Sequence, residues 1–190
     1  MIRPNQPTTV LRRNQAGFTL IELLIVVAII GVIAAIAVPG LLRARVAGNE
    51  ASAIANLRVL NSSQQAYAES CGNGFYASSL LILADPAPVG TAFISPDLGA
   101  AAVVAKSGYQ LIMEEGSEAT AAMKDGCNPS GTAASLFSSH YASNAPITAG
   151  QTGTRWFWTN TMGTIFASSA DDFAAIHVGN ARPGAGAPVQ

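Results

Sequence analysis

The sequence contains few of the residues from which most catalytic sites and metal sites are built. Only 11% of its 190 residues are charged, whereas about a quarter is usual in soluble domains. The formal net charge is -1, so the composition offers no basic surface for nucleic acid. The two histidines, His140 and His177, are isolated from other ligand-type residues. We expect them at the surface or in packing contacts rather than on a metal ion.

Sequence motifs for other chemistries are missing as well. No serine lies in a G-x-S-x-G segment, which surrounds the nucleophile of many hydrolases. Asp171 and Asp172 have no D-x-D-x-D-G pattern around them, so a calcium loop there is a weak alternative. We therefore expect neither an enzyme nor a bound cofactor or metal ion.

The sequence has only two cysteines, Cys71 and Cys127, and they lack metal-ligand spacing such as C-x-x-C. An even number of cysteines in an exported chain indicates a disulfide. Two free thiols are the alternative for a cytosolic chain. Because the N-terminus favours export, we expect a Cys71–Cys127 disulfide.

The feature that the sequence does have is one long apolar run, residues 18–42. Its length of about 25 residues corresponds to roughly 37 Å of helix, enough to cross a bilayer. A cleaved secretory signal has a shorter apolar stretch and a small-residue cleavage site after it. The preceding residues carry Arg3, Arg12 and Arg13 and no acid. This bias predicts a cytoplasmic N-terminus and an external remainder.

One carboxylate, that of Glu22, lies near the start of this apolar run. A charged group in the hydrocarbon costs about 2.5–3.5 kcal/mol on insertion scales, so such a residue usually has a function. The alternative is that Glu22 lies at the bilayer surface and does nothing. Three interpretations of the N-terminus follow: a secretory signal, a plain signal anchor, or an anchor that is processed after Gly17.

Residues 16–39 resemble the N-terminus of type IV prepilins and type II secretion pseudopilins, which carry a class III signal sequence. The resemblance implies that prepilin peptidase removes a cytoplasmic leader, residues 1–17, by cutting after Gly17. Phe18 would then be the N-methylated first residue and Glu22 the fifth. Gly31 and Pro39 fall where the family has residues that weaken the helix.

Cleavage before Phe18 would create an ammonium group about one helical turn from Glu22. The two charges can pair within one chain, or the amine of one chain can meet Glu22 of a neighbour. Pairing between identical helices would set the axial register more than it would add stability. Pro39 removes a backbone hydrogen bond, so the helix should kink or loosen there. The resemblance implies that Gly31 to Pro39 can lose helicity on assembly.

After Pro39 the pattern becomes amphipathic, which predicts a helix to Ser70 with one face on a sheet. The apolar residues at helical spacing are Val46, Ala53, Leu57, Leu60 and Tyr67. The polar residues interleaved with them are Arg45, Asn49, Glu50, Asn56, Asn61 and Gln65. Two glycines in residues 71–74 should end the helix. From residue 18 the helix would be about 80 Å long and would protrude.

The remaining residues predict a small head, residues 43–180, with an antiparallel sheet. We expect a short buried helix within 74–85, strands at 108–114 and 140–144, and a hairpin of 154–159 with 164–167. Residues 116–135 should be irregular, and 181–190 should be a flexible tail. Trp156, Phe157 and Trp158 are either an adhesive surface or, more simply, alternate sides of a strand with one face in the core.

These observations predict an α+β fold: a long N-terminal helix, its apolar half (18–42) protruding, packed by its C-terminal half on the sheet. The resemblance implies a type IV pilus subunit that polymerises with other pilin subunits. Implied partners are prepilin peptidase, an inner-membrane assembly platform and an ATPase. The precursor would lie in the inner membrane with its head in the periplasm, and the product in an extracellular pilus.

Two alternative functions remain. A pseudopilin of a type II secretion system shares the N-terminus, but the chain lacks an Asp-Pro-Trp-Gly-like segment and acidic calcium ligands near its C-terminus. A membrane-anchored binding module that never polymerises predicts no processing at Gly17 and tolerance of Glu22→Ala.

Overall fold

The computed structural model of the protein describes residues 17–116, 119–169 and 187–189. The chain divides into two compact units, Met1–Leu41 and Leu42–Gln190. Helix α1 (Leu20–Ser70) contributes its first part to the first unit and its remainder to the second. The predicted helix is therefore confirmed, and it continues through Gly31 and Pro39 without interruption.

The part of α1 in the first unit exposes its side chains on all sides. Large apolar residues there are 48% to 84% exposed, the extremes being Val26 and Phe18 just before the helix. The helix is long and apolar enough to cross a membrane, judged by length and composition alone. Such a surface is what a membrane segment or a helix awaiting partners presents.

The end of α1 is defined by a tight turn at residues 71–74. The backbone N–H groups of Cys71 and Gly72 donate to the carbonyl of Tyr67 at 2.8 and 2.7 Å. Asn73 and Gly74 have φ of 54° and 89°, so Asn73, not Gly72, supplies the second left-handed residue. Gly72 is needed for another reason, because a Cβ there would lie 2.1 Å from the Phe75 carbonyl oxygen.

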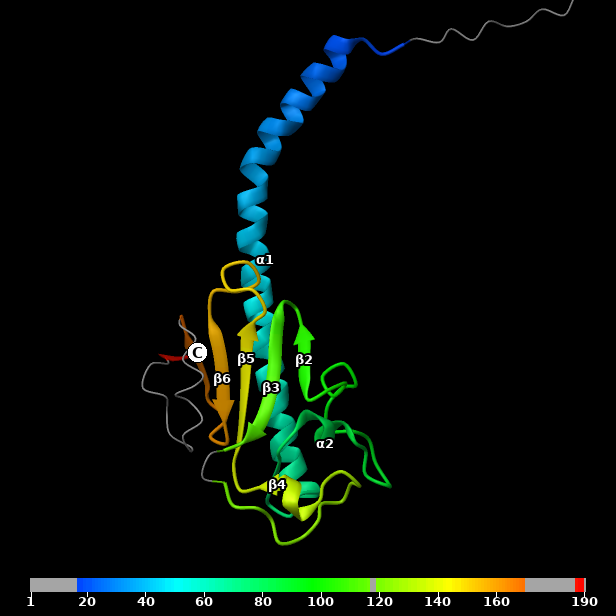
Figure 1. Ribbon diagram of the computed structural model, residues 1–190, viewed down its shortest axis with the longest axis vertical. Coiled ribbons are helices and arrows are strands. Elements are labelled where there is room, and N and C mark those ends of the chain that lie inside the picture. The colour runs from blue at the N-terminus through cyan, green and yellow to red at the C-terminus, as the bar shows by residue number, and fades with distance from the viewer. Residues whose placement is uncertain (1–16, 117–118, 170–186, 190) are drawn as a thin grey trace, which may run out of the picture. The chain divides into compact units, whose positions relative to one another are not determined.

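The second part of α1 packs one face on the sheet, as Figure 1 shows for the helix behind β3 and β5. The predicted apolar residues Ala53, Leu57, Leu60 and Tyr67 are buried there, and Val46 is half-buried. Polar residues of the interleaved set also lie on this face, since Glu50 and Asn56 are buried. Polarity therefore did not mark the solvent side of this part of the helix.

The main sheet is antiparallel, and its strands follow the order β2-β3-β5-β6-β7-β8 within the described residues. These strands are Val103–Lys106, Tyr109–Glu115, His140–Pro146, Trp156–Asn160, Ile165–Ser168 and Ala187–Pro188. A second pair joins β1 (Tyr76–Ala77) to β4 (Leu136–Phe137), and the short helix α2 covers Leu80–Ala84. The predicted short helix, two strands and hairpin are confirmed.

Two parts of the sheet differ from the predictions. Strand β2 was not predicted, and it pairs with β3 through a turn at Ser107 and Gly108, whose φ values are 50° and 73°. Within the expected flexible tail, Ala187–Pro188 forms β8 and pairs with β7. Pro188 fits because β8 is an edge strand of the described sheet. The other tail residues, His177 and Asp171-Asp172 lie outside the described residues.

Strand β6 places its aromatic residues on both faces of the sheet. Phe157 is fully buried in the core beneath α1. Trp158 is buried on the opposite face with Tyr141 and Phe166, and its ring stacks on Phe166 at 5.9 Å. Trp156 is half-buried. The predicted alternation is confirmed, and both faces of this strand are packed.

Candidate assembly site and the contacts that hold the head

The N-terminus of α1 is closed by Thr19 and Glu22. The Thr19 hydroxyl donates to Glu22 Oε2 at 2.7 Å, and the Thr19 backbone N–H donates to the same oxygen at 3.1 Å. The Glu22 backbone N–H donates in return to Thr19 Oγ1 at 3.3 Å. This reciprocal pattern is a capping box, which satisfies backbone donors that the first helical turn leaves unpaired.

The partner of Glu22 in the single chain is therefore Thr19, which was not among the residues predicted for the site. Its signal was present, because the T-x-x-E spacing of a capping box occurs at residues 19–22. Gly17 and Phe18 precede the helix in exposed, non-helical chain. The peptide bond between them thus lies outside the helical hydrogen-bond ladder.

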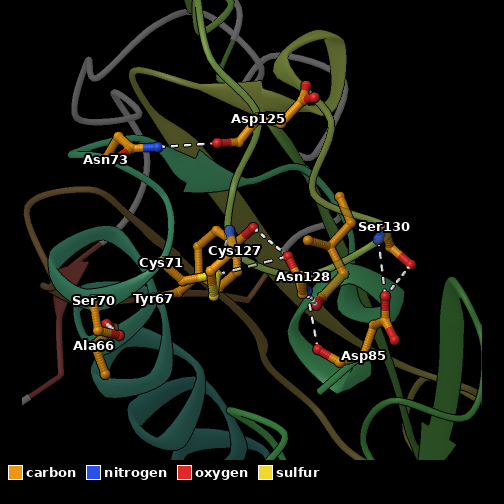
Figure 2. The surroundings of a disulfide bond; sticks show 11 residues. Ala66, Tyr67, Ser70, Cys71, Asn73, Asp85, Asp125, Cys127, Asn128 and Ser130 are labelled. Carbon is orange, nitrogen blue, oxygen red and sulfur yellow. Dashed lines mark hydrogen bonds between the residues drawn. A yellow bond between two sulfur atoms is a disulfide. The ribbon is translucent and has the colours of Figure 1, made fainter. Parts of the chain in front are cut away.

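The predicted disulfide is confirmed between Cys71 and Cys127, with an S–S length of 2.03 Å and a Cα–Cα distance of 4.8 Å. It joins the end of α1 to the irregular segment before β4, as Figure 2 shows. The Cys127 backbone N–H donates to the Cys71 carbonyl at 3.1 Å, which adds a second link at the same place.

Asn128, next to the disulfide, connects three parts of the second unit. Its Oδ1 accepts from the Tyr67 hydroxyl at 2.9 Å, and its Nδ2 donates to the carbonyls of Ile82 and Asp85 at 2.6 and 2.9 Å (Figure 2). Burial, with a smaller contribution from the Asp85 charge, raises the pKa of Tyr67 to about 12. Tyr67 therefore stays a neutral donor, and a buried polar side chain is fully used.

Glu50 forms the corresponding connection near the other end of the helical face. It is only 6% exposed, and its carboxylate accepts from the Thr154 N–H and hydroxyl at 2.9 and 2.8 Å. Arg155 completes the site with an ion pair of 2.7 Å. Burial by itself raises the pKa of Glu50, but the bonds from Thr154 and Arg155 outweigh it and lower the pKa below its ordinary value.

His140 has a packing role. It is 2% exposed and its ring lies 4.9 Å from that of Tyr76. Burial lowers the pKa of His140 to about 4, so the ring is neutral at pH 7. Within the described part of the chain, no group of three or more potential metal ligands occurs.

Comparison with known proteins gives a family-model match at the N-terminus and two similar pilins. Residues 12–38 match the family model of the prokaryotic N-terminal methylation motif. The chain is 47% identical over 55 residues to the type IV major pilin protein PilA of Myxococcus xanthus, over 29% of the chain and 24% of the relative. It is 49% identical over 55 residues to the type IV wide pilus major component PilA4 of Thermus thermophilus.

The second match covers 29% of the chain and 42% of the relative, so the chain spans less than half of either relative. No solved structure matches the chain. The motif contains Gly17, Phe18 and Glu22, and the fold is a long N-terminal helix packed on an antiparallel sheet. The chain thus carries the prokaryotic N-terminal methylation motif, and over 55 residues it is similar to two type IV major pilins.

Proposed function

We propose that the chain is the structural subunit of a type IV pilus and polymerises through its N-terminal helix. Prepilin peptidase removes residues 1–17, and Phe18 becomes the N-methylated first residue. Residues 18–42 hold the precursor in the inner membrane and later form the filament core. The leader is cytoplasmic, and the head is first periplasmic and then part of the extracellular pilus. The assembly platform and its ATPase are the further partners.

The observation that carries this proposal is the exposed apolar surface of α1 between Leu20 and Leu42. Water does not favour a contiguous apolar surface of this kind, so it needs lipid or other helices around it. A membrane satisfies it in the precursor and copies of the same helix satisfy it in a filament. The names of the two matched relatives support the second environment.

Glu22 has a specific role in this proposal. In the single chain its carboxylate is satisfied by Thr19. Among apolar helices, an ionised carboxylate without a positive partner is costly, so the axial register that brings the Phe18 amine of another copy to Glu22 is favoured. Gly31 and Pro39 are the residues at which the helix would lose hydrogen bonds when subunits pack into a filament. Pro39 has no backbone N–H, so one helical hydrogen bond is already missing there.

The deciding experiment compares Glu22→Ala with Glu69→Ala, which removes an exposed carboxylate from the same helix. We expect few or no filaments in sheared surface material from Glu22→Ala and wild-type numbers from Glu69→Ala, counted by electron microscopy. Near-ultraviolet circular dichroism should show an unchanged second unit in both variants. Wild-type filament numbers in Glu22→Ala would show that Glu22 is not required for assembly.

Mass measurement of the same filaments tests the processing step. We expect the subunit to begin at a methylated Phe18, and Gly17→Glu to leave uncleaved precursor in the membrane. A mature protein that keeps residues 1–17 and forms no filament would instead identify a membrane-anchored protein that does not polymerise.

A further inference from the structure

A groove lies in the second unit where α1 leaves the apolar segment. Its volume is about 930 Å³. One wall is the start of the second part of α1, with Leu42, Val46 and Asn49. The opposite wall consists of the β2–β3 turn at Ser107-Gly108 and the β5–β6 loop, residues 150–154.

Two arginines flank the groove. Arg43 and Arg45 both line it, and because residues two apart lie on different sides of a helix, they flank the face that carries Val46. Within the described residues, the side chain of neither arginine has a hydrogen bond or an ion pair. The acid in the same lining, Glu50, is already neutralised by Arg155 at 2.7 Å. The groove is therefore positive, and Leu42 and Val46 add apolar surface to its helical wall.

The position of the groove in the sequence indicates what occupies it. Leu42 is both the last residue of the apolar segment and part of the groove lining. Arg43 and Arg45 follow within about 5 Å along the helix axis. If residues 18–42 span the hydrocarbon, these guanidinium groups lie at the level of the phospholipid phosphates. Arginine at this depth typically pairs with them.

We propose that the groove binds the headgroup of a membrane phospholipid in the leaflet next to the second unit. Arg43 and Arg45 contact the phosphate oxygens from the two sides of Val46, and Leu42, on the membrane side of both arginines, contacts the glycerol and the first acyl carbons. Guanidinium groups suit this ligand because their donors form charge-assisted bonds to phosphate oxygens. The inference rests on the proposed function, because it takes residues 18–42 as a membrane segment.

The test uses the full-length chain, purified in a phosphate-free maltoside detergent and titrated with phosphatidylglycerol or phosphatidylethanolamine. Native mass spectrometry counts bound lipid. We expect the double variant Arg43→Gln/Arg45→Gln to bind both lipids about 10- to 30-fold more weakly. Arg58→Gln is the matched control, because Arg58 is exposed on the same helix but lies outside the groove lining. It should bind lipid as the wild type does.

Two ligands separate the possible sources of the phosphate. Diacylglycerol with the same acyl chains lacks the phosphate and should bind no better than the double variant binds phospholipid. Inorganic phosphate in large excess should leave bound lipid in place. Equal lipid binding by the double variant, equal binding of diacylglycerol, or displacement by inorganic phosphate would each overturn the proposal. Loss of self-association in the double variant, with lipid binding retained, would identify a second copy as the occupant and overturn it too.

Flotation with phospholipid vesicles distinguishes this proposal from the proposed function. If the wild-type chain does not float, residues 18–42 are not a membrane segment, and the proposed function is overturned. If the double variant floats like the wild type and binds lipid equally well, the headgroup site is overturned but the proposed function is not. Because both arginines are exposed on a helix, glutamine at these positions should leave the second unit folded, which its unfolding midpoint in urea checks.

Discussion

The two parts of α1 belong to one helix but differ in the burial of their side chains. From Leu20 to Arg45 every residue is exposed, although most are apolar. From Glu50 to Ala68 the helix buries nine residues, and four of them are polar: Glu50, Asn56, Ser63 and Gln64. The more apolar part of the helix is thus the less buried part.

This difference shows that burial within one chain depends on partners more than on polarity. Gln64 is fully buried because its amide donates to the Ala77 carbonyl at 2.7 Å and accepts from the Ala77 N–H at 3.0 Å. Ile29 is 55% exposed because no described part of the chain covers it. A buried polar group needs its hydrogen bonds, and an exposed apolar run implies a partner outside the chain.

Removal of the disulfide should have the largest effect, and only on the second unit. Cys71 and Cys127 are separated by 56 residues, so the disulfide should contribute about 4 kcal/mol to the free energy of unfolding by restricting the unfolded chain. We expect Cys71→Ser/Cys127→Ser to lower the midpoint of urea unfolding. Near-ultraviolet circular dichroism of the tryptophans would monitor the unfolding. Wild-type protein reduced with a phosphine is the control and should match the variant. An unchanged midpoint would show that the hydrogen bonds of Asn128 hold the end of α1 in place without the disulfide.

A buried apolar residue and an exposed one on the same helix give the next contrast. Leu57 has no exposed surface, so Leu57→Ala should cost about 2–5 kcal/mol through lost burial and the cavity left behind. Ile29→Ala, at an exposed position, should leave the urea midpoint of the second unit unchanged. Equal losses in the two variants would contradict the contrast, because they would show that residue 29 supports the second unit.

The charge of Glu50 should make part of the stability depend on pH. Its pKa in the folded chain is below the ordinary value of 4.5, so the contribution is fully present above pH 4.5 and is lost as the pH falls through the folded pKa. Glu50→Gln should lose about 1–2 kcal/mol at pH 7 and show a flatter stability profile below pH 4.5. Glu69→Gln, at an exposed position on the same helix, should keep the wild-type profile. A wild-type slope in Glu50→Gln would contradict the prediction.

Periodic features were predictable from the sequence because they repeat along the chain. The row of Ala53, Leu57 and Leu60 predicted the buried helical face, and alternation predicted that Phe157 and the two tryptophans lie on opposite faces of β6. Strand β2 was missed because Val103–Lys106 has no such alternation in polarity. It pairs with β3 across the turn at residues 107–108.

The polar contacts were not predictable in the same way, because their partners are distant in sequence. Tyr67 and Asn128 are 61 residues apart, and Glu50 and Thr154 are 104 apart. Nothing in the local pattern around Glu50 separates a buried carboxylate from a solvated one. Thr19 differs from these residues, since its partner Glu22 is three positions away and the capping box was present in the sequence.

Two glycines of α1 provide the smallest and most direct comparison of its two parts. Neither Gly31 nor Gly48 has a heavy atom within 4 Å of the position of an added Cβ, and both are exposed in the helix. Glycine in a helix interior costs roughly 0.5–1 kcal/mol relative to alanine. Gly48→Ala should therefore raise the free energy of unfolding of the second unit by about that amount, measured in urea.

Gly31→Ala adds the same intrinsic helix preference to the part of α1 that has no partner among the described residues. It should leave the unfolding of the second unit unchanged. If assembly requires the helix to open between Gly31 and Pro39, this variant should also reduce filament number, whereas Gly48→Ala should not. A Gly31→Ala variant with wild-type filaments would show that the helix packs into the filament as continuous as it is in the single chain. Assembly would then not require the helix to open between Gly31 and Pro39. Of the two features proposed for the N-terminal part of α1, only the pairing of Glu22 with the Phe18 amine would remain.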